Sequence, residues 1–420
     1  MTVCMQLVST CIIRSGTKSD HSHWRMEKNR KMTEYILMNK DTEVLPFTIV
    51  YDRNNFYSFI ADRPLGRLPL GFESMEHWLD NRKASKHNGF LAELMDQCGC
   101  RNAEGFIRVT HATSINDTFW VKSAAENVHW KDVSLYTNDF DETISKLAFE
   151  GIGLYGIQLS STSPELTTNG SFRKCFRKEN GTIFMYKRGS SGYANAGTEP
   201  YCEIIGSSVA EKLCRNSVHY DLVTLHGEIA TRCRLFTSEK YGYAPFSVFM
   251  KGHTLSISEA VSFFERLGQE SADTFRRMMV IDALTFNRDR HAGNFGVLFD
   301  NDTLEPVKMA PVFDMNMCML AGFMAQDLEN PWSRIRQFSP SFSGVNDFIS
   351  LGKAFLNSEI RKDLISTGKL TVGIKPDKVM ANDMIRRLEK ILNLQKDALL
   401  SGKYSDESEV FVPGVSIDKL

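Results

Sequence analysis

The chain has 420 residues, of which 42% are hydrophobic and 24% are charged, and its formal net charge is -1. This length is too great for one ordinary core, so we expect two or three folding units. A net charge near zero excludes a strong overall field that would attract nucleic acid or an anionic membrane. No apolar run is long enough to cross a bilayer. We therefore expect a cytoplasmic protein with no membrane partner and no direct nucleic-acid binding.

The cysteines are scattered, and the one close pair is Cys98-Gly99-Cys100. A single intervening residue suits neither a zinc knuckle nor a redox turn. We expect reduced thiols that serve as small hydrophobic side chains, which is typical of the cytosol.

The first third of the chain has mixed character. We expect 1–31 to be a disordered extension, with Met32 opening the folded part, and we assign 32–150 to an N-terminal accessory unit. β-branched and aromatic residues predict strands, and apolar residues at helical spacing predict a helix. The expected elements are strands at 43–51, 56–60 and 114–122 and a helix at 75–99.

The remainder changes from strands to helices along the chain. We expect a strand-rich lobe at 151–236, a helical lobe at 237–402 and a flexible tail at 403–420. This order is typical of an α+β fold. The expected strands are 182–187, 221–225 and 228–236. The expected helices are 203–214, 256–267, 271–284, 345–356, 358–366 and 376–400, the last capped by Asp377 and closed by Gly402.

Residues able to do chemistry gather in 284–296, which reads LTFNRDRHAGNFG and precedes an apolar strand. The next apolar stretch ends in Asp314, which we place at the end of a strand. Phosphoryl transfer needs one carboxylate that orients the attacking hydroxyl, and an Asn and a second Asp that hold magnesium. Asp289, Asn294 and Asp314 supply this set. The alternative is a solvated turn whose polar residues cap helices. The position of Asp314 at the end of the following predicted strand counts against this alternative.

Lys187 lies at the end of an otherwise apolar predicted strand. A lysine in this position can hold the α- and β-phosphates of ATP, and Glu203, near the start of the following helix, is its expected ion-pair partner. The alternative is an edge-strand lysine that only discourages unwanted strand pairing.

A polar stretch between two predicted strands, 167–174, reads TTNGSFRK. Backbone N–H groups at Gly170 and Ser171 could bind phosphate oxygens, with Lys174 adding charge. The stretch lacks the Walker pattern, and taken alone it favours a plain surface loop.

The pattern Asn-x-Asp-x-His-x-x-Asn, followed by a carboxylate after an apolar stretch, resembles the catalytic loop of HipA-like serine/threonine kinases. Asp-Arg-His-x-x-Asn is also similar to the loop of phosphoinositide kinases. The resemblance to HipA-like proteins extends over about 151–400. It implies a bilobal protein-kinase-like fold.

The resemblance also implies roles for individual residues. Asp289 would be the catalytic base, and Asn294 and Asp314 would be the magnesium ligands. Lys187 would hold the ATP phosphates, and His291 would complete the catalytic loop as a structural member.

Two further features follow from the resemblance. Phe236 and Thr237 would lie at the hinge beside adenine, and the loop at 167–174 would be open to autophosphorylation. The sequence departs from eukaryotic protein kinases in having Asp-Met-Asn where they have Asp-Phe-Gly, and in placing the His after the catalytic Asp. These departures favour an atypical kinase.

We therefore expect an ATP- and Mg²⁺-dependent kinase that transfers the γ-phosphoryl group to a Ser or Thr hydroxyl of a protein, itself included. The alternatives are a lipid or small-molecule kinase and a catalytically idle nucleotide-binding regulator. The partners in keeping with the resemblance are ATP, a protein acceptor and a small helix-turn-helix protein encoded nearby. Membership of a toxin–antitoxin pair is left open.

Overall fold

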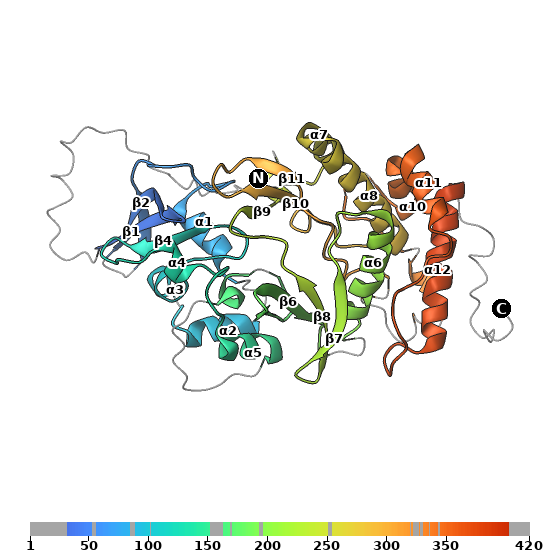
Figure 1. The fold of residues 1–420 in the computed structure, drawn as a ribbon, viewed down its shortest axis with the longest axis horizontal. Helices are drawn as coiled ribbons and strands as arrows, with labels where there is room; N and C mark the ends of the chain where they lie inside the picture. Colours follow the sequence, from blue (N-terminus) through green and yellow to red (C-terminus); the bar gives the residue numbers. More distant parts are fainter. Residues whose placement is uncertain are drawn as a thin grey trace, which may run out of the picture. The chain divides into compact units, whose positions relative to one another are not determined.

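A computed structural model describes residues 32–402 apart from 53–55, 85–88, 101, 152–162, 169, 193–195, 251–253, 320, 322–326, 328–330, 336 and 343–344. The predicted N-terminal extension and C-terminal tail lie outside the described residues. The chain divides into two compact units (Figure 1). Unit 1 holds the described residues of 1–141 and 155–170, and unit 2 holds those of 142–154 and 171–420.

Unit 1 is built on a four-stranded antiparallel sheet of order β3-β2-β1-β4. The fully buried Trp120 anchors one face, where its indole Nε1 donates to the carbonyl of Lys40 at 2.7 Å and its ring packs with Met38 and Trp130. The strands are β1 (Met32–Asn39), β2 (Thr42–Tyr51), β3 (Tyr57–Ala61) and β4 (Phe119–Ser123), and the helices are α1 (Met75–Arg82), α2 (Gly89–Gln97), α3 (Ala103–Thr110), α4 (Trp130–Val133) and the 3₁₀ helix Pro164–Thr167.

One helix expected in this unit, at 75–99, is two helices. Lys83 takes an extended conformation with ψ 140° and ends α1, and α2 begins only at Gly89. The prediction of a single helix was wrong because a helical apolar pattern does not show where one helix ends and a second of similar polarity begins.

Unit 2 begins with a strand-rich part whose sheet has the order β5-β6-β8-β7, all antiparallel. Helix α6 packs against β6, β7 and β8, and α5 packs against β5 (Figure 1). Helix α6 starts four residues before the predicted 203–214 because Pro200 occupies its first turn, where the fixed φ of proline suits a helix start. The elements are α5 (Glu142–Glu150), β5 (Lys174–Glu179), β6 (Thr182–Arg188), α6 (Glu199–Leu213), β7 (Tyr220–Leu225) and β8 (Glu228–Arg234).

The rest of unit 2 is mainly helical and is centred on α8, which is buried along most of its length. Helix α8 contacts α6, α7, α10 and α12, and a small antiparallel sheet of order β11-β10-β9 lies beside it. The elements are β9 (Tyr241–Pro245), the 3₁₀ helix Phe246–Phe249, α7 (Ile257–Leu267), α8 (Gln269–Thr285), β10 (Gly296–Asp300), β11 (Pro306–Met309), α9 (Pro331–Ile335), α10 (Phe348–Phe355), α11 (Ser358–Ser366) and α12 (Asn382–Ser401).

The predicted α+β class is confirmed, with strands followed by helices in unit 2. The last helix was predicted to start at 376 with Asp377 as its cap, which is wrong. Helix α12 begins at Asn382, whereas the Asp377 carboxylate accepts from the backbone N–H groups of Val379 and Met380 and closes a separate turn. Gly402 ends the helix with φ 83°, as expected for a C-terminal glycine.

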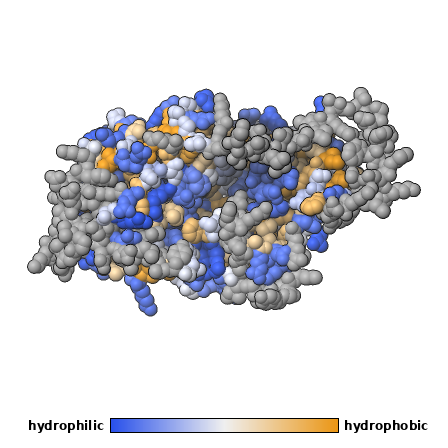
Figure 2. All heavy atoms as spheres, turned by 180° about the vertical axis from the view of Figure 1, so that it is seen from behind, coloured by the Kyte–Doolittle hydropathy of each residue, from blue (hydrophilic) through white to orange (hydrophobic). Residues whose placement is uncertain are grey.

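The expected use of cysteine is confirmed for the described residues. Their thiols are free and buried at positions 98, 100, 175, 202, 214, 233 and 318. Within the described ranges, no helix combines the length and the apolarity that crossing a bilayer would require. On the face drawn in Figure 2, hydrophilic side chains cover much of the described surface and hydrophobic ones form smaller patches.

Candidate active site

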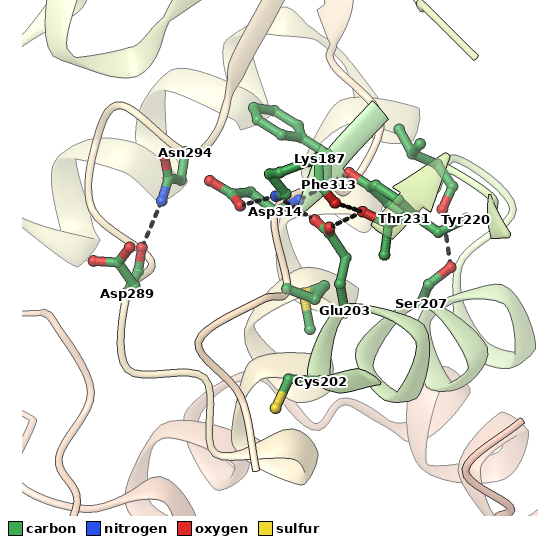
Figure 3. Close-up of polar contacts among 12 residues, drawn as sticks. Lys187, Cys202, Glu203, Ser207, Tyr220, Thr231, Asp289, Asn294, Phe313 and Asp314 are labelled. Carbon is green, nitrogen blue, oxygen red and sulfur yellow. Dashed lines mark hydrogen bonds and ion pairs between the residues drawn. The ribbon is translucent and has the colours of Figure 1, made fainter. Parts of the chain in front are cut away.

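Lys187 is the centre of a buried charged cluster in unit 2. Its Nζ lies 2.6 Å from Glu203 Oε1 and 2.9 Å from Asp314 Oδ1 (Figure 3). Strand β6 supplies the lysine, α6 supplies the glutamate, and Thr231 on β8 donates to the other oxygen of Glu203 at 2.7 Å. The predicted ion pair between Lys187 and Glu203 is therefore present, and Asp314 joins it.

The charges in this cluster support one another. Burial by itself lowers the pKa of the Lys187 ammonium, but Asp314 and Glu203 outweigh burial and raise it. Burial raises the pKa of Asp314, and the attraction of Lys187 and Arg290 overcomes this and lowers it. Glu203 is fully buried, and burial raises its pKa against the pull of Lys187. We infer that Lys187 stays charged and that Asp314 stays ionised across the physiological range.

Lys174 is a second cation at this site. It is the first residue of β5 and pairs with Lys187 across the β5–β6 ladder. Burial and the neighbouring charge of Lys187 lower its pKa to about 8. The prediction that Lys174 belongs to a loop was wrong, because the ladder with β6 already includes it.

The other residues predicted to bind phosphate lie just before this strand. Gly170 has φ 118°, which favours glycine, and it belongs to unit 1, whereas Ser171 is exposed and belongs to unit 2. The stretch was expected to follow a strand, but it follows the 3₁₀ helix Pro164–Thr167. Thr167 and Thr168 both donate their hydroxyl groups to the carbonyl of Pro164, which favours this tight turn over a strand.

The catalytic loop predicted from the sequence begins where α8 ends. Phe286 takes the left-handed conformation with φ 56° and turns the chain out of the helix. Asn294 Nδ2 donates to the carbonyl of Asp289 at 2.9 Å, which closes the loop and fixes the amide (Figure 3). His291 is exposed, and its Nδ1 accepts from the backbone N–H of Gly293 at 3.0 Å. The histidine therefore shapes the turn.

Asp289 itself is half exposed and carries a perturbed carboxyl group. Burial raises its pKa, Asp314 raises it further, and the nearby His291 partly offsets both effects. Arg290 Nη1 donates to the carbonyls of Asn294 and Phe313, so the loop of Asp289 lies beside the segment of Asp314.

Asp314 does not lie at the end of a strand, as the sequence analysis predicted. Strand β11 ends at Met309, and Val312 forms only an isolated bridge with Ser217. Asp314 has φ 58°, a left-handed conformation that is costly for a residue with a side chain. The backbone N–H of Asp314 donates to the Tyr220 hydroxyl at 3.4 Å, which helps to hold this conformation together with the ion pair to Lys187.

Two buried residues behind the loop were missed by the sequence analysis. Asp282 on α8 and Arg290 in the loop form an ion pair with Nε–Oδ2 at 2.9 Å, and each side chain is 1% exposed. One signal was available. A carboxylate within a helix stretch that is otherwise apolar demands a buried partner.

The predicted hinge residues occupy the connection between β8 and β9. The ring of Phe236 packs against Tyr243 and Phe313, with centroids 5.7 and 5.4 Å away, and Phe313 directly precedes Asp314. Thr237 is buried in the same connection. The structure therefore brings Phe236 to the site through Phe313.

The oxygen ligands present suit magnesium. Asp314 offers a carboxylate and Asn294 an amide whose nitrogen is already engaged with Asp289. Over the part of the chain that the structure describes, no group of three or more His, Cys, Asp or Glu residues could hold a metal. One carboxylate and one amide oxygen fit Mg²⁺, which usually binds one or two protein oxygens together with substrate phosphates.

Comparisons with known proteins give structural neighbours of low sequence identity. No family model and no curated protein matches the sequence. The proinflammatory kinase CtkA of Helicobacter pylori is similar over 56% of this chain and 90% of its own, with 16% identity and a TM-score of 0.43. A complex of HipA, HipB and operator DNA from a Shewanella oneidensis toxin–antitoxin system covers 91% of this chain and 100% of its own, with 12% identity and a TM-score of 0.44.

At such TM-scores the similarity assigns no role to any residue, and the contacts within this chain carry the functional proposal.

Proposed function

We propose that the chain is a kinase that uses ATP and Mg²⁺ and transfers the γ-phosphoryl group to a hydroxyl group of a protein Ser or Thr. The observation that carries this proposal is Lys187 held between Glu203 and Asp314. Protein kinases place a strand lysine against a helix glutamate and hold magnesium with an Asp and an Asn. The lysine–glutamate pair in unit 2 and the contact of Lys187 with Asp314, the proposed metal ligand, support this proposal.

Each residue then has a defined task. Lys187 binds the α- and β-phosphates, and Asn294 and Asp314 would hold the magnesium ion, which when bound neutralises phosphate charge. Asp289 orients the acceptor hydroxyl and takes its proton. The bond from the acceptor oxygen to the γ-phosphorus forms as the bond to the β–γ bridging oxygen breaks, and ADP leaves. The raised pKa of Asp289 brings this carboxylate nearer to the basicity that a proton acceptor needs.

Two other functions remain as outcomes of the test. A lipid or small-molecule kinase would use the same residues with another acceptor, and an idle regulator would bind ATP without transferring phosphate. We also propose a small helix-turn-helix protein as a partner. The motif resemblance to HipA-like kinases suggests it, and the HipA neighbour was solved together with HipB.

The test is transfer of label from [γ-³²P]ATP by the purified full chain with Mg²⁺, offered a mixture of proteins and, separately, phosphoinositide vesicles. We expect label in protein Ser or Thr, and loss of transfer in Lys187→Met. Lys362→Met, which changes an exposed lysine on α11, is the matched control. Label confined to lipid would favour the lipid kinase, and bound ATP without any transfer would favour the regulator.

A further inference from the structure

Arg290 uses every donor of its guanidinium group inside unit 2. Nε and Nη2 bind the two carboxylate oxygens of Asp282 at 2.9 and 3.1 Å, and Nη2 also contacts Met315 Sδ at 2.9 Å. Nη1 donates to two backbone carbonyls, those of Asn294 and Phe313, each at 2.7 Å. A guanidinium group has five N–H donors, and these contacts account for all of them.

The two carbonyls belong to the two segments that carry the proposed metal ligands. One is the carbonyl of Asn294 itself, and the other immediately precedes Asp314. A single nitrogen atom therefore ties the catalytic loop to the segment of Asp314. Because the two bonds share Nη1, the separation of the two backbones is fixed by one rigid group.

Asp282 extends the same network to the third catalytic position. Its Oδ1 also accepts from Asn287 Nδ2 at 2.8 Å, and Asn287 Oδ1 accepts from the backbone N–H of Asp289 at 3.2 Å. The backbones at Asn294 and Phe313 are thus linked through Arg290, and the backbone at Asp289 through Asn287, to one carboxylate on α8.

A contribution to stability does not by itself explain why Asp282 and Arg290 form a buried ion pair. Taking both charges out of water is costly, and a well-packed apolar pair of similar volume often serves stability as well or better. What an apolar pair lacks is the ability to bond two carbonyl groups at once. The planar fork of arginine provides this, whereas the ammonium of lysine presents its donors from a single atom on a flexible stem.

We propose that Asp282 and Arg290 are positioning residues that set the distance between Asn294 and Asp314 and so tune magnesium binding. This inference rests on the proposed function. It predicts that disturbing Arg290 changes the magnesium dependence of the protein, over and above any change in its stability.

The experiment compares Arg290→Lys with wild type in the full chain. The matched control is Arg277→Lys, which alters a second largely buried arginine, this one on α8, where it binds Asp273, Asp363 and the carbonyl of Leu213. Three quantities are measured: the melting temperature, the affinity for ATP without metal, and the Mg²⁺ concentration that gives half of the metal-dependent gain in ATP binding. We expect Arg290→Lys to raise that Mg²⁺ concentration at least tenfold while ATP binding without metal changes less than threefold.

Both variants should lower the melting temperature, but Arg277→Lys should leave the Mg²⁺ concentration at half-effect unchanged. An unchanged value in Arg290→Lys, or an equal rise in both variants, would overturn the inference and leave the proposed function standing. A wild-type chain that binds ATP with no dependence on Mg²⁺ would overturn the proposed function and the inference with it.

Discussion

Lys174 and Lys187 pair across the ladder of β5 and β6, so two ammonium groups belong to neighbouring strand positions. The pKa of Lys174 is lowered from 10.5 to about 8 by burial and by Lys187. The unfolded chain therefore binds this proton more tightly than the folded chain does. Below pH 8 the lysine opposes folding, and its opposition fades as the pH rises from 8 to 10.5.

We predict that Lys174→Met raises the melting temperature by a few degrees at pH 7 without nucleotide. The advantage should shrink as the pH rises through 8 to 10.5, because wild type then loses the unfavourable charge. ATP binding should weaken about tenfold, since a phosphate-binding cation is gone. Calorimetry over this pH range and a nucleotide titration check both effects. A variant that is less stable at pH 7 would contradict this account of Lys174.

At the scale of single residues, sequence patterns predicted the residues proposed to bind or react, but not the buried pair behind them. Lys187 and Glu203 could be paired because a lysine on an apolar strand followed by an acidic helix start is a local pattern. Asp282 and Arg290 meet only after α8 has ended and the chain has turned back. The left-handed backbone of Asp314 likewise has no signal in the sequence, because it depends on Tyr220 and Lys187.

Helix α6 approaches the segment after Asp314 closely, and Gly206 makes this possible. A Cβ atom at Gly206 would lie 2.4 Å from Met315 Cβ, which is too close for the two segments to stay in place. In most helix interiors, replacing glycine by alanine gains about 1 kcal/mol. Here overpacking should cost about 1–3 kcal/mol and cancel or exceed that gain.

We therefore predict that Gly206→Ala leaves stability equal or lower and reduces phosphoryl transfer at least tenfold, because Met315 must move and Asp314 is its neighbour. Ser208→Ala, on the same helix, is the control and should keep its activity. Denaturant unfolding and transfer assays measure the two effects. If Gly206→Ala is clearly more stable and fully active, α6 and the segment of Met315 can move apart without disturbing Asp314, which would contradict this prediction.

Most of the helices and strands predicted in unit 2 are present, several with shifted bounds, whereas α5, β9 and α9 were not predicted. Three errors concern residues beside the ends of strands or helices. Asp314 follows an isolated bridge, Asp377 closes a turn before α12, and Lys174 joins β5 although its neighbours look like a loop. Local residue types do not encode these boundaries, because contacts with distant segments decide them.

At the scale of the whole molecule, α5 belongs to unit 2 although unit 1 resumes after it. The fully buried Phe149 packs with Cys175, Tyr186 and Ala230, and Ser145 donates to the carbonyl of Phe176 at 3.1 Å. The sequence does not predict that the chain passes from unit 1 to unit 2 and back, because the composition of a short helix does not show which unit it packs against.

We predict that a protein beginning at Gly151 melts about 10 °C below one beginning at Glu142, because it lacks α5. Losing a buried phenylalanine costs about 3–5 kcal/mol, and each kcal/mol shifts the melting temperature by about 2–4 °C. Circular dichroism melts of the two truncated proteins make the comparison. Equal melting temperatures would mean that α5 contributes little to unit 2.

In the proposed function, Asp289 takes the proton of the acceptor hydroxyl and Asp314 holds the magnesium ion. The most direct measurement compares Asp289→Asn and Asp314→Asn with wild type for Mg²⁺-dependent ATP binding and for transfer from [γ-³²P]ATP. We predict that both variants lose transfer by several orders of magnitude. Asp289→Asn should keep Mg²⁺-dependent ATP binding, and Asp314→Asn should lose that dependence because a metal ligand is gone. Transfer that survives in both variants would contradict the account.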